Sequence, residues 1–334
     1  MPGPNQFRLA ASVPSASSAS LSSVSRPSAY SRLLHTSTSQ AATASAALQT
    51  TAHPRPISAQ FLANTLINKP APLQTAKMST MQACHGHNEA CCNIPPVVTS
   101  GYSPKGSYSE YDGLKTYVTG PDDATKGIVV IYDIFGYFDQ TVQGADILAT
   151  SDDHTKYKVF IPDWFQGEPC PIEWYPPDND EKKKNLGAFF GKNPPPGVAE
   201  KLPAFVKALN VKHPNIKSWG LIGFCWGGKV VSLTTTNAET NPFSIAAECH
   251  PAMVNPEEAK GIKVPLILLA SKEEPEDKVK EFEQNLSVPK HVETFKDQIH
   301  GFMAARSDLK DERVKSEYIR GYKTVLEFFG KHWN

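Results

Sequence analysis

One short segment constrains the fold of this chain more than any other, because it combines an apolar run, a cysteine and closely spaced glycines. The run 218–222 (Ser-Trp-Gly-Leu-Ile) leads directly into 223–228 (Gly-Phe-Cys-Trp-Gly-Gly), after which a helical pattern begins. Glycines on both sides of Cys225 allow a strand to turn sharply into a helix where larger side chains would collide. The positive end of that helix would stabilise a thiolate at Cys225. The segment therefore predicts a reactive cysteine between a strand and a helix.

The chain from about residue 100 alternates short apolar runs with helical patterns. It opens with a hairpin, 108–111 and 114–118, around an Asp112-Gly113 turn. Apolar strands that alternate with helices predict an α/β fold, with a mostly parallel central sheet and helices on both faces. Further strands are expected at 128–132, 158–161, 218–222, 244–247, 265–270 and 292–295, and helices at 198–209, 277–286 and 314–329.

In an α/β sheet, a Gly-x-Cys-x-Gly turn is typical of the nucleophile elbow of the α/β-hydrolase fold, with cysteine in place of serine. That fold places the acid and then the histidine after the nucleophile. His300 lies just past the last expected strand and is the predicted base. His213 lies in a polar loop and His291 starts a strand, so neither is favoured. His250 ends a strand, and we interpret it as a wall of the pocket.

The acid should follow the strand 265–270, but no aspartate stands at the expected distance. A glutamate also orients an imidazole and stabilises its positive form. Glu274 is the first choice for this role, Glu273 the second and Asp277 the third.

Composition excludes several classes of function. The 34 basic and 34 acidic residues balance over the whole chain, but residues 1–88 hold six basic residues and no acidic one. The remainder is therefore acidic and has no basic stripe, which argues against a nucleic-acid partner. No run of about 18 apolar residues exists, so we expect no membrane insertion. Six cysteines without regular spacing indicate free thiols in a reducing compartment.

The first 99 residues predict an extension rather than part of the catalytic domain. Residues 1–77 are rich in Ser, Ala and Thr and lack acidic residues, which is typical of a mitochondrial presequence; a disordered tail is the alternative. Met78 could start a second, cytosolic form. Residues 78–99 form a flexible lead-in whose cysteines and histidines match no standard zinc spacing, so no metal is expected (Cys84, His85, His87, Cys91 and Cys92).

Residues 100–334 form the predicted catalytic domain and resemble the dienelactone hydrolase family. The resemblance rests on 132–136 (Tyr-Asp-Ile-Phe-Gly), on 223–228 and on 300–302 (His-Gly-Phe). The segment 91–96 also resembles the start of fungal members. Within the domain, 162–197 is loop-rich and is expected to form a lid, a pocket wall or a plain surface insertion.

The resemblance implies a role for each of the site residues. Cys225 would be the nucleophile, His300 the base and Glu274 the acid, while the backbone N–H groups of Ile134 and Trp226 would form the oxyanion hole. These residues would need neither a metal nor an organic cofactor.

Two further residues, Asp133 and Arg306, are expected to affect the thiol or the choice of substrate. Asp133 stands where the family has a glutamate that contacts the cysteine, so it is expected either to tune the thiol or to cap the following loop. Bacterial members of the family hold a substrate carboxylate with two arginines, and Arg306, six residues after His300, could serve as one of them. The second is missing, because no arginine lies between Arg55 and Arg306. The Trp and Tyr residues of 164–175 favour a more apolar substrate.

The sequence therefore predicts a hydrolase that cleaves a small ester or lactone through a Cys-His-Glu triad and an acyl-enzyme. The alternative is a non-catalytic or redox-sensing module of the same fold with a reactive thiol. We expect a monomer or weak homodimer, located in mitochondria.

Overall fold

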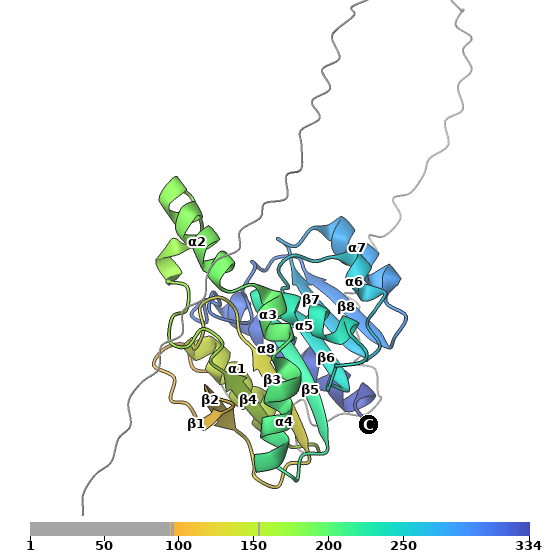
Figure 1. The fold of residues 1–334 in the computed structure, drawn as a ribbon. Helices are drawn as coiled ribbons and strands as arrows, with labels where there is room; N and C mark the ends of the chain where they lie inside the picture. Colours follow the sequence, from red (N-terminus) through yellow and green to blue (C-terminus); the bar gives the residue numbers. More distant parts are fainter. Residues whose placement is uncertain (1–93, 95–96, 153) are drawn as a thin grey trace, which may run out of the picture. The chain divides into compact units, whose positions relative to one another are not determined.

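Eight strands form one sheet in the computed structural model, which describes residue 94 and residues 97–152 and 154–334 (Figure 1). The strands are β1 (Ser107–Tyr111), β2 (Leu114–Thr119), β3 (Lys126–Ile131), β4 (Tyr157–Pro162), β5 (Ser218–Phe224), β6 (Ile245–Cys249), β7 (Leu266–Ser271) and β8 (Lys290–Phe295). Their order is β1-β2-β4-β3-β5-β6-β7-β8. Strand β2 pairs antiparallel with β1 and β4, and all later pairs are parallel. The predicted hairpin and mostly parallel sheet are confirmed.

Helices cover both faces of this sheet. Helices α1 and α8 pack together on one face, and α3 and α5 pack together on the other (Figure 1). Among the helices of the described residues, none is long and apolar enough to cross a membrane. The helices are α1 (Asp139–Thr150), η2 (Ile172–Trp174), α2 (Asp180–Lys192), α3 (Pro195–Ala199), α4 (Leu202–Lys212), α5 (Trp226–Thr236), α6 (Pro256–Ala259), α7 (Glu276–Asn285) and α8 (Glu312–His332).

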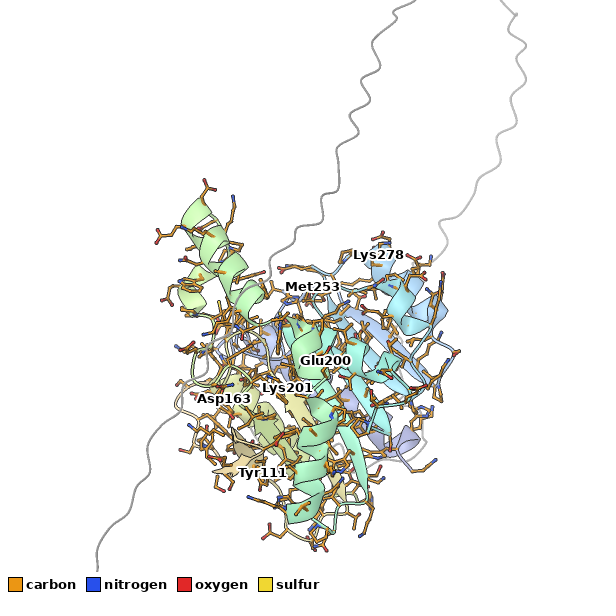
Figure 2. The ribbon with its side chains drawn as sticks, in the orientation of Figure 1. Tyr111, Asp163, Glu200, Lys201, Met253 and Lys278 are labelled. Atoms are coloured by element: carbon orange, nitrogen blue, oxygen red, sulfur yellow. The ribbon has the colours of Figure 1, made fainter. Side chains whose placement is uncertain are left out.

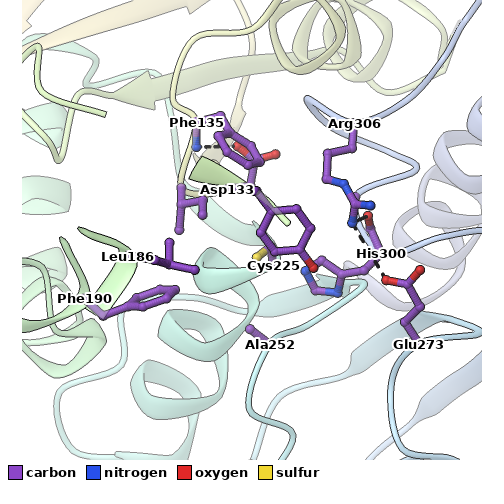
Figure 3. Close-up of a pocket in the computed structure, with 12 residues that line it drawn as sticks. Asp133, Phe135, Leu186, Phe190, Cys225, Ala252, Glu273, His300 and Arg306 are labelled. Atoms are coloured by element: carbon purple, nitrogen blue, oxygen red, sulfur yellow. Dashed lines mark hydrogen bonds and ion pairs between the residues drawn. The ribbon is translucent and has the colours of Figure 1, made fainter. Parts of the chain in front are cut away.

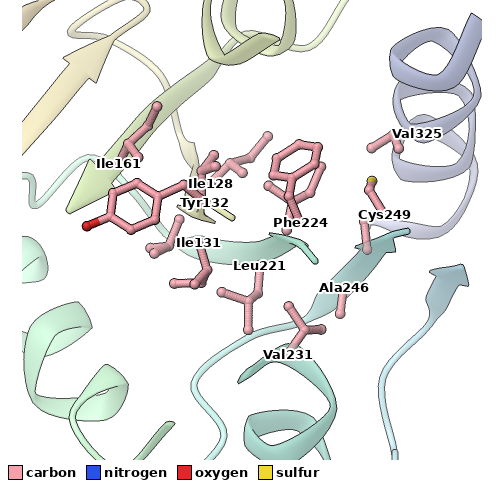
Figure 4. Packing of buried hydrophobic residues seen from close by; sticks show 14 of the residues in the cluster. Ile128, Ile131, Tyr132, Ile161, Leu221, Phe224, Val231, Ala246, Cys249 and Val325 are labelled. Atoms are coloured by element: carbon pink, nitrogen blue, oxygen red, sulfur yellow. The ribbon is translucent and has the colours of Figure 1, made fainter. Parts of the chain in front are cut away.

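The core lies on both sides of the central strands. Leu221 of β5 faces Val231 of α5, whereas Cys249 of β6 lies beside Val325 of α8 (Figure 4). All four side chains are fully buried. Burial of a branched aliphatic side chain contributes about 1.5–3 kcal/mol, so these two layers hold the central strands rigidly. Burial on both faces also explains why the strands are continuous apolar runs rather than alternating ones.

Two helical predictions need correction. The helix expected at 198–209 is in fact two helices, which meet at Glu200 and Lys201 (Figure 2). Pro203 has no N–H to continue the first helix, but it fits the first turn of α4. The excursion 162–197 is not only loop, because it contains α2. Asn179 caps this helix by accepting a hydrogen bond from the Lys182 N–H at 2.9 Å.

The predicted presequence and the Cys84–Cys92 cluster lie outside the described residues, so both stay predictions. The described residues all belong to one compact unit, Thr80–Asn334. This unit contains the whole of the predicted catalytic domain.

Candidate active site

Cys225 lies on the sharp turn between β5 and α5. Its backbone has φ 54° and ψ −114°, a region that non-glycine residues rarely adopt. Four main-chain hydrogen bonds hold this geometry. The Cys225 N–H donates to the Cys249 carbonyl at 3.1 Å, and the Cys225 carbonyl accepts from the N–H groups of Gly228, Lys229 and Ala252 at 3.0, 3.4 and 2.9 Å. The strained turn places Cys225 directly before the N-terminus of α5.

The two glycines beside Cys225 are required by close approach of the backbone. A Cβ on Gly223 would stand 2.2 Å from the Gly227 carbonyl oxygen, and a Cβ on Gly227 would stand 2.2 Å from the Ile131 carbonyl oxygen. Both distances are far below van der Waals contact, so a side chain at Gly223 would push α5 away from β5, and one at Gly227 would push α5 away from β3. This confirms the reason for which the sequence pattern predicted a tight turn here.

His300 and Glu274 form a hydrogen-bonded pair. The Nδ1 atom of His300 lies 2.6 Å from Oε1 of Glu274, and because a carboxylate only accepts, Nδ1 carries the proton. Glu274 is itself fixed by Ser271, whose backbone N–H and hydroxyl both donate to it. Glu274 is buried, with only 7% of the residue exposed. The structure thus leaves Nε2 of His300 free of the acid and able to act as a base.

The charges around His300 favour its protonated form. Burial lowers the pKa of His300, but the charge and hydrogen bond of the Cys225 thiolate, together with Glu274, outweigh burial and raise that pKa to about 10. The same interaction links the cysteine to the histidine. His300 therefore interacts with Glu274 through Nδ1 and also with Cys225, which is the arrangement that the predicted triad requires.

The other candidates for acid and base lie elsewhere. Glu273 points to Arg306 instead of His300, and Asp277 is an exposed residue in the first turn of α7. His213 contacts the Tyr111 hydroxyl at 2.9 Å. His291 lies 3.4 Å from Glu293 on the exposed strand β8.

His250 was predicted to be a pocket wall, and this is wrong. It is fully buried, and its ring packs edge-on against His300 with the centroids 5.2 Å apart. Burial holds the pKa of His250 well below its usual range, so the ring is neutral. His250 thus packs against the base and is not among the residues that line the cavity. Its backbone has a positive φ of 37°.

The two amides predicted for an oxyanion hole are available. Among the described residues, neither the Ile134 nor the Trp226 N–H donates a hydrogen bond. Trp226 is the first residue of α5, where an amide has no partner within the helix. The Ile134 carbonyl accepts a hydrogen bond from the Cys170 N–H at 2.8 Å, which joins this loop to the segment that contains Cys170.

Asp133 connects two loops of the site. One carboxylate oxygen accepts from the Phe135 N–H at 2.9 Å, and the other accepts from the Ala305 N–H at 3.1 Å. The residue is buried, and this burial raises the pKa of Asp133 to about 6 although both amides oppose the shift. Asp133 therefore caps the loop after β3, which was one of the two roles predicted for it. It also joins that loop to the segment after His300. No hydrogen bond joins it to Cys225 within the described residues.

Arg306 lies at the same pocket, but its guanidinium already contacts other groups of the protein. Its guanidinium donates to the His300 carbonyl, stands 4.5 Å from the centre of the Tyr175 ring, and lies 3.8 Å from a Glu273 oxygen. These contacts hold the side chain against the wall of the pocket.

A cavity of about 340 Å³ contains the thiol and the imidazole (Figure 3). Its lining combines six charged or titratable residues with an apolar wall. The lining residues are Asp133, Ile134, Phe135, Tyr175, Leu186, Phe190, Cys225, Ala252, Glu273, His300, Gly301 and Arg306. The volume suits a small ligand.

The family can be assigned at this point. A model of the dienelactone hydrolase family matches residues 114–333. The chain belongs to this family. Its members share the α/β-hydrolase fold seen here, and membership makes the protein a hydrolase.

Three relatives illustrate the range of the dienelactone hydrolase family around this chain. An AIM2 family protein of Schizosaccharomyces pombe is 36% identical and covers 68% of this chain and 92% of its own. Hydrolase tropI of Talaromyces stipitatus is 25% identical, covering 69% and 91%. A carboxymethylenebutenolidase homolog of Xenopus tropicalis is 26% identical, covering 74% and 99%.

One solved structure supports the fold. A dienelactone hydrolase candidate from Klebsiella pneumoniae superposes with a TM-score of 0.51 at 19% identity, covering 65% of this chain and 92% of its own.

Sequence reasoning missed part of the pocket wall in this family member. Leu186 and Phe190 line the cavity from α2, a helix that was not predicted. The signal was present, since Asn179 is followed by two acidic residues in a first helical turn. Of the aromatic residues predicted to favour an apolar substrate, Tyr175 lines the cavity, whereas Trp164 is buried against Phe205.

Proposed function

We propose that this hydrolase cleaves a small carboxylic ester or lactone, with Cys225 as nucleophile, His300 as base and Glu274 as acid. The observation that carries the proposal is the hydrogen-bonded pair of Glu274 and His300, with His300 and Cys225 lining the same cavity. A nucleophile, a base and a residue that orients the base form the arrangement expected for covalent catalysis. The carboxymethylenebutenolidase homologs among the relatives support a lactone or ester substrate.

The first half-reaction forms an acyl-enzyme. The Cys225 thiol passes its proton to Nε2 of His300, and the sulfur attacks the substrate carbonyl to form a C–S bond. The carbonyl oxygen becomes negative and accepts hydrogen bonds from the Ile134 and Trp226 amides. The C–O bond then breaks, and the His300 imidazolium gives its proton to the departing alkoxide.

The second half-reaction releases the product. His300 removes a proton from water, and the resulting hydroxide attacks the thioester carbonyl. The C–S bond breaks and Cys225 recovers its proton from His300. Glu274 stays ionised throughout and stabilises each imidazolium through its 2.6 Å contact with Nδ1.

Replacing the nucleophile tests this proposal directly. Cys225→Ala should abolish hydrolysis of p-nitrophenyl butyrate while circular dichroism stays unchanged. Cys225→Ser should also be weak, because a neutral hydroxyl is harder to ionise than a thiol at a helix N-terminus. Activity of Cys225→Ala equal to that of the parent would exclude the proposed nucleophile.

Intact-protein mass spectrometry separates this function from a redox-sensing one. After mixing with activated esters or lactones, a hydrolase should carry an acyl adduct on Cys225 that decays as product is released. A persistent oxidised thiol without turnover would instead support the redox module.

A further inference from the structure

Apart from the reacting pair of Cys225 and His300, the charges that line the cavity are unfavourable for an anionic substrate. Arg306 is the one arginine or lysine among the lining residues of the described structure, and two carboxylates, Asp133 and Glu273, line the same space. Glu273 lies 3.8 Å from the Arg306 guanidinium, with about 39% of its side chain exposed. A carboxylate that approached Arg306 would therefore also be repelled by the neighbouring Glu273.

The opposite side of the cavity is apolar. Leu186 and Phe190 lie on one side of Cys225, whereas Arg306 and Glu273 lie on the other (Figure 3). Both apolar side chains come from α2, and Phe190 is 36% exposed although it is a large hydrophobic residue. An aromatic side chain that remains half-exposed beside a reactive thiol offers a contact surface for an apolar group of a ligand.

We propose, on the basis of the function proposed above, that the site takes uncharged esters or lactones with an apolar group against Leu186 and Phe190. In this arrangement, Glu273 is a specificity-determining residue. Its carboxylate pairs with Arg306 and repels substrates that carry a carboxylate. The site therefore selects neutral substrates by disfavouring charged ones. Arg306 then serves as part of the wall, held by Tyr175 and Glu273, and not as a carboxylate clamp.

Two esters of equal chain length and the same leaving group test the inference. These are p-nitrophenyl butyrate, which is neutral, and mono-p-nitrophenyl succinate, which ends in a carboxylate. The parent should have a kcat/KM for the butyrate at least about tenfold higher, because like charges at a binding site are strongly disfavoured. Glu273→Gln should lower the butyrate-to-succinate ratio of kcat/KM by on the order of fivefold, which is the size of effect expected for a partly exposed charge pair. Arg306→Gln should raise the same ratio, because the negative charge of Glu273 is then unpaired.

A matched control removes the same charge outside the cavity. Glu276 is exposed at the start of α7 and does not line the cavity, so Glu276→Gln should leave the ratio unchanged. On the apolar side, Phe190→Ala should lower the butyrate-to-acetate ratio of kcat/KM by about threefold, since less than one methylene's worth of contact is lost. Circular dichroism of every variant should match the parent.

The outcomes separate the two proposals. If turnover depends on Cys225 but the parent cleaves the succinate as fast as the butyrate, the specificity inference is wrong and the proposed function stands. The specificity inference is also wrong if the butyrate-to-succinate ratio of kcat/KM is no smaller in Glu273→Gln than in Glu276→Gln. If Cys225→Ala still cleaves both esters, the proposed function is wrong and the inference that rests on it falls too.

Discussion

Replacing Glu274 by glutamine tests the most specific contact in the site. Glutamine keeps the size of the side chain but has one acceptor oxygen, whereas the carboxylate uses two. Oε1 of Glu274 faces Nδ1 of His300 at 2.6 Å, and Oε2 accepts from the Ser271 N–H. In Glu274→Gln, one of these donors must lose its acceptor. If the amide NH2 turns to His300, it donates to Nδ1 and forces the proton onto Nε2, the atom that must act as base.

The size of the effect follows from this geometry. The bond joins a carboxylate to an imidazole that becomes positive during the reaction, and 97% of the Glu274 side chain is shielded from solvent, since its exposed fraction is 3%. A hydrogen bond to a charged group contributes about 1.5–3 kcal/mol. If this stabilisation is lost in the transition state, kcat/KM should fall by roughly 10- to 150-fold.

Glu273→Gln is the matched control, because it changes the neighbouring residue in the same way. Glu273 makes no contact with the His300 ring, and its pair with Arg306 is long and partly exposed. Such a pair contributes about 0–1 kcal/mol, so kcat/KM for p-nitrophenyl butyrate should change by less than about fivefold. The assay is the release of p-nitrophenol at saturating and subsaturating ester, with thermal unfolding as a check on folding. Equal small effects of the two variants would mean that neither is the acid, and a larger effect of Glu273→Gln would move the role to it.

Three further predictions concern pH, stability and location. Because the pKa of His300 is raised to about 10, the alkaline limb of kcat/KM should lie near pH 10, and Glu274→Gln should move it to lower pH; an unmoved limb would contradict this. Asp133 has a folded-state pKa of about 6, above its unfolded value, so the free energy of unfolding should fall by about 2–3 kcal/mol as pH rises from about 4 to about 6. Asp133→Asn should remove this part of the slope in urea titrations, and identical slopes in both proteins would refute the assignment. We also propose that residues 1–77 direct a fluorescent reporter to mitochondria, because the membrane potential attracts positive charge by about 2.3 kcal/mol per charge per 100 mV. A form of the protein that starts at Met78 should stay cytosolic and active. A reporter that stayed in the cytosol when fused to residues 1–77 would reject the targeting claim.

The sequence was sufficient for the turn at Cys225 because every requirement of that turn is local. A strand, a helix and glycines at fixed offsets are all visible in residues 218–236, and the close approaches of Gly223 and Gly227 follow from them. The wall formed by α2 was missed for the opposite reason. In its 13 residues, only Leu186 and Phe189 are buried, so the helix has too few apolar positions to give a clear period. Its place beside the cavity depends on tertiary contacts, such as the bond from the Trp226 indole N–H to the Asn193 carbonyl at 3.0 Å.

The choice between Glu273 and Glu274 shows where sequence reasoning ends. The carboxyl ends of parallel strands meet at one edge of a sheet, so the residues after β3, β5, β7 and β8 are brought together whatever their side chains are. Strand order therefore predicts that some acid after β7 reaches the histidine after β8. Which of two adjacent glutamates does so depends on the turn that follows β7. There the N–H and hydroxyl of Ser271 hold Glu274 inward, and Glu273 is left to face Arg306. The same turn thus separates the two carboxylates by role, one beside the base and one at the mouth of the cavity, and this separation is what the paired glutamine variants measure.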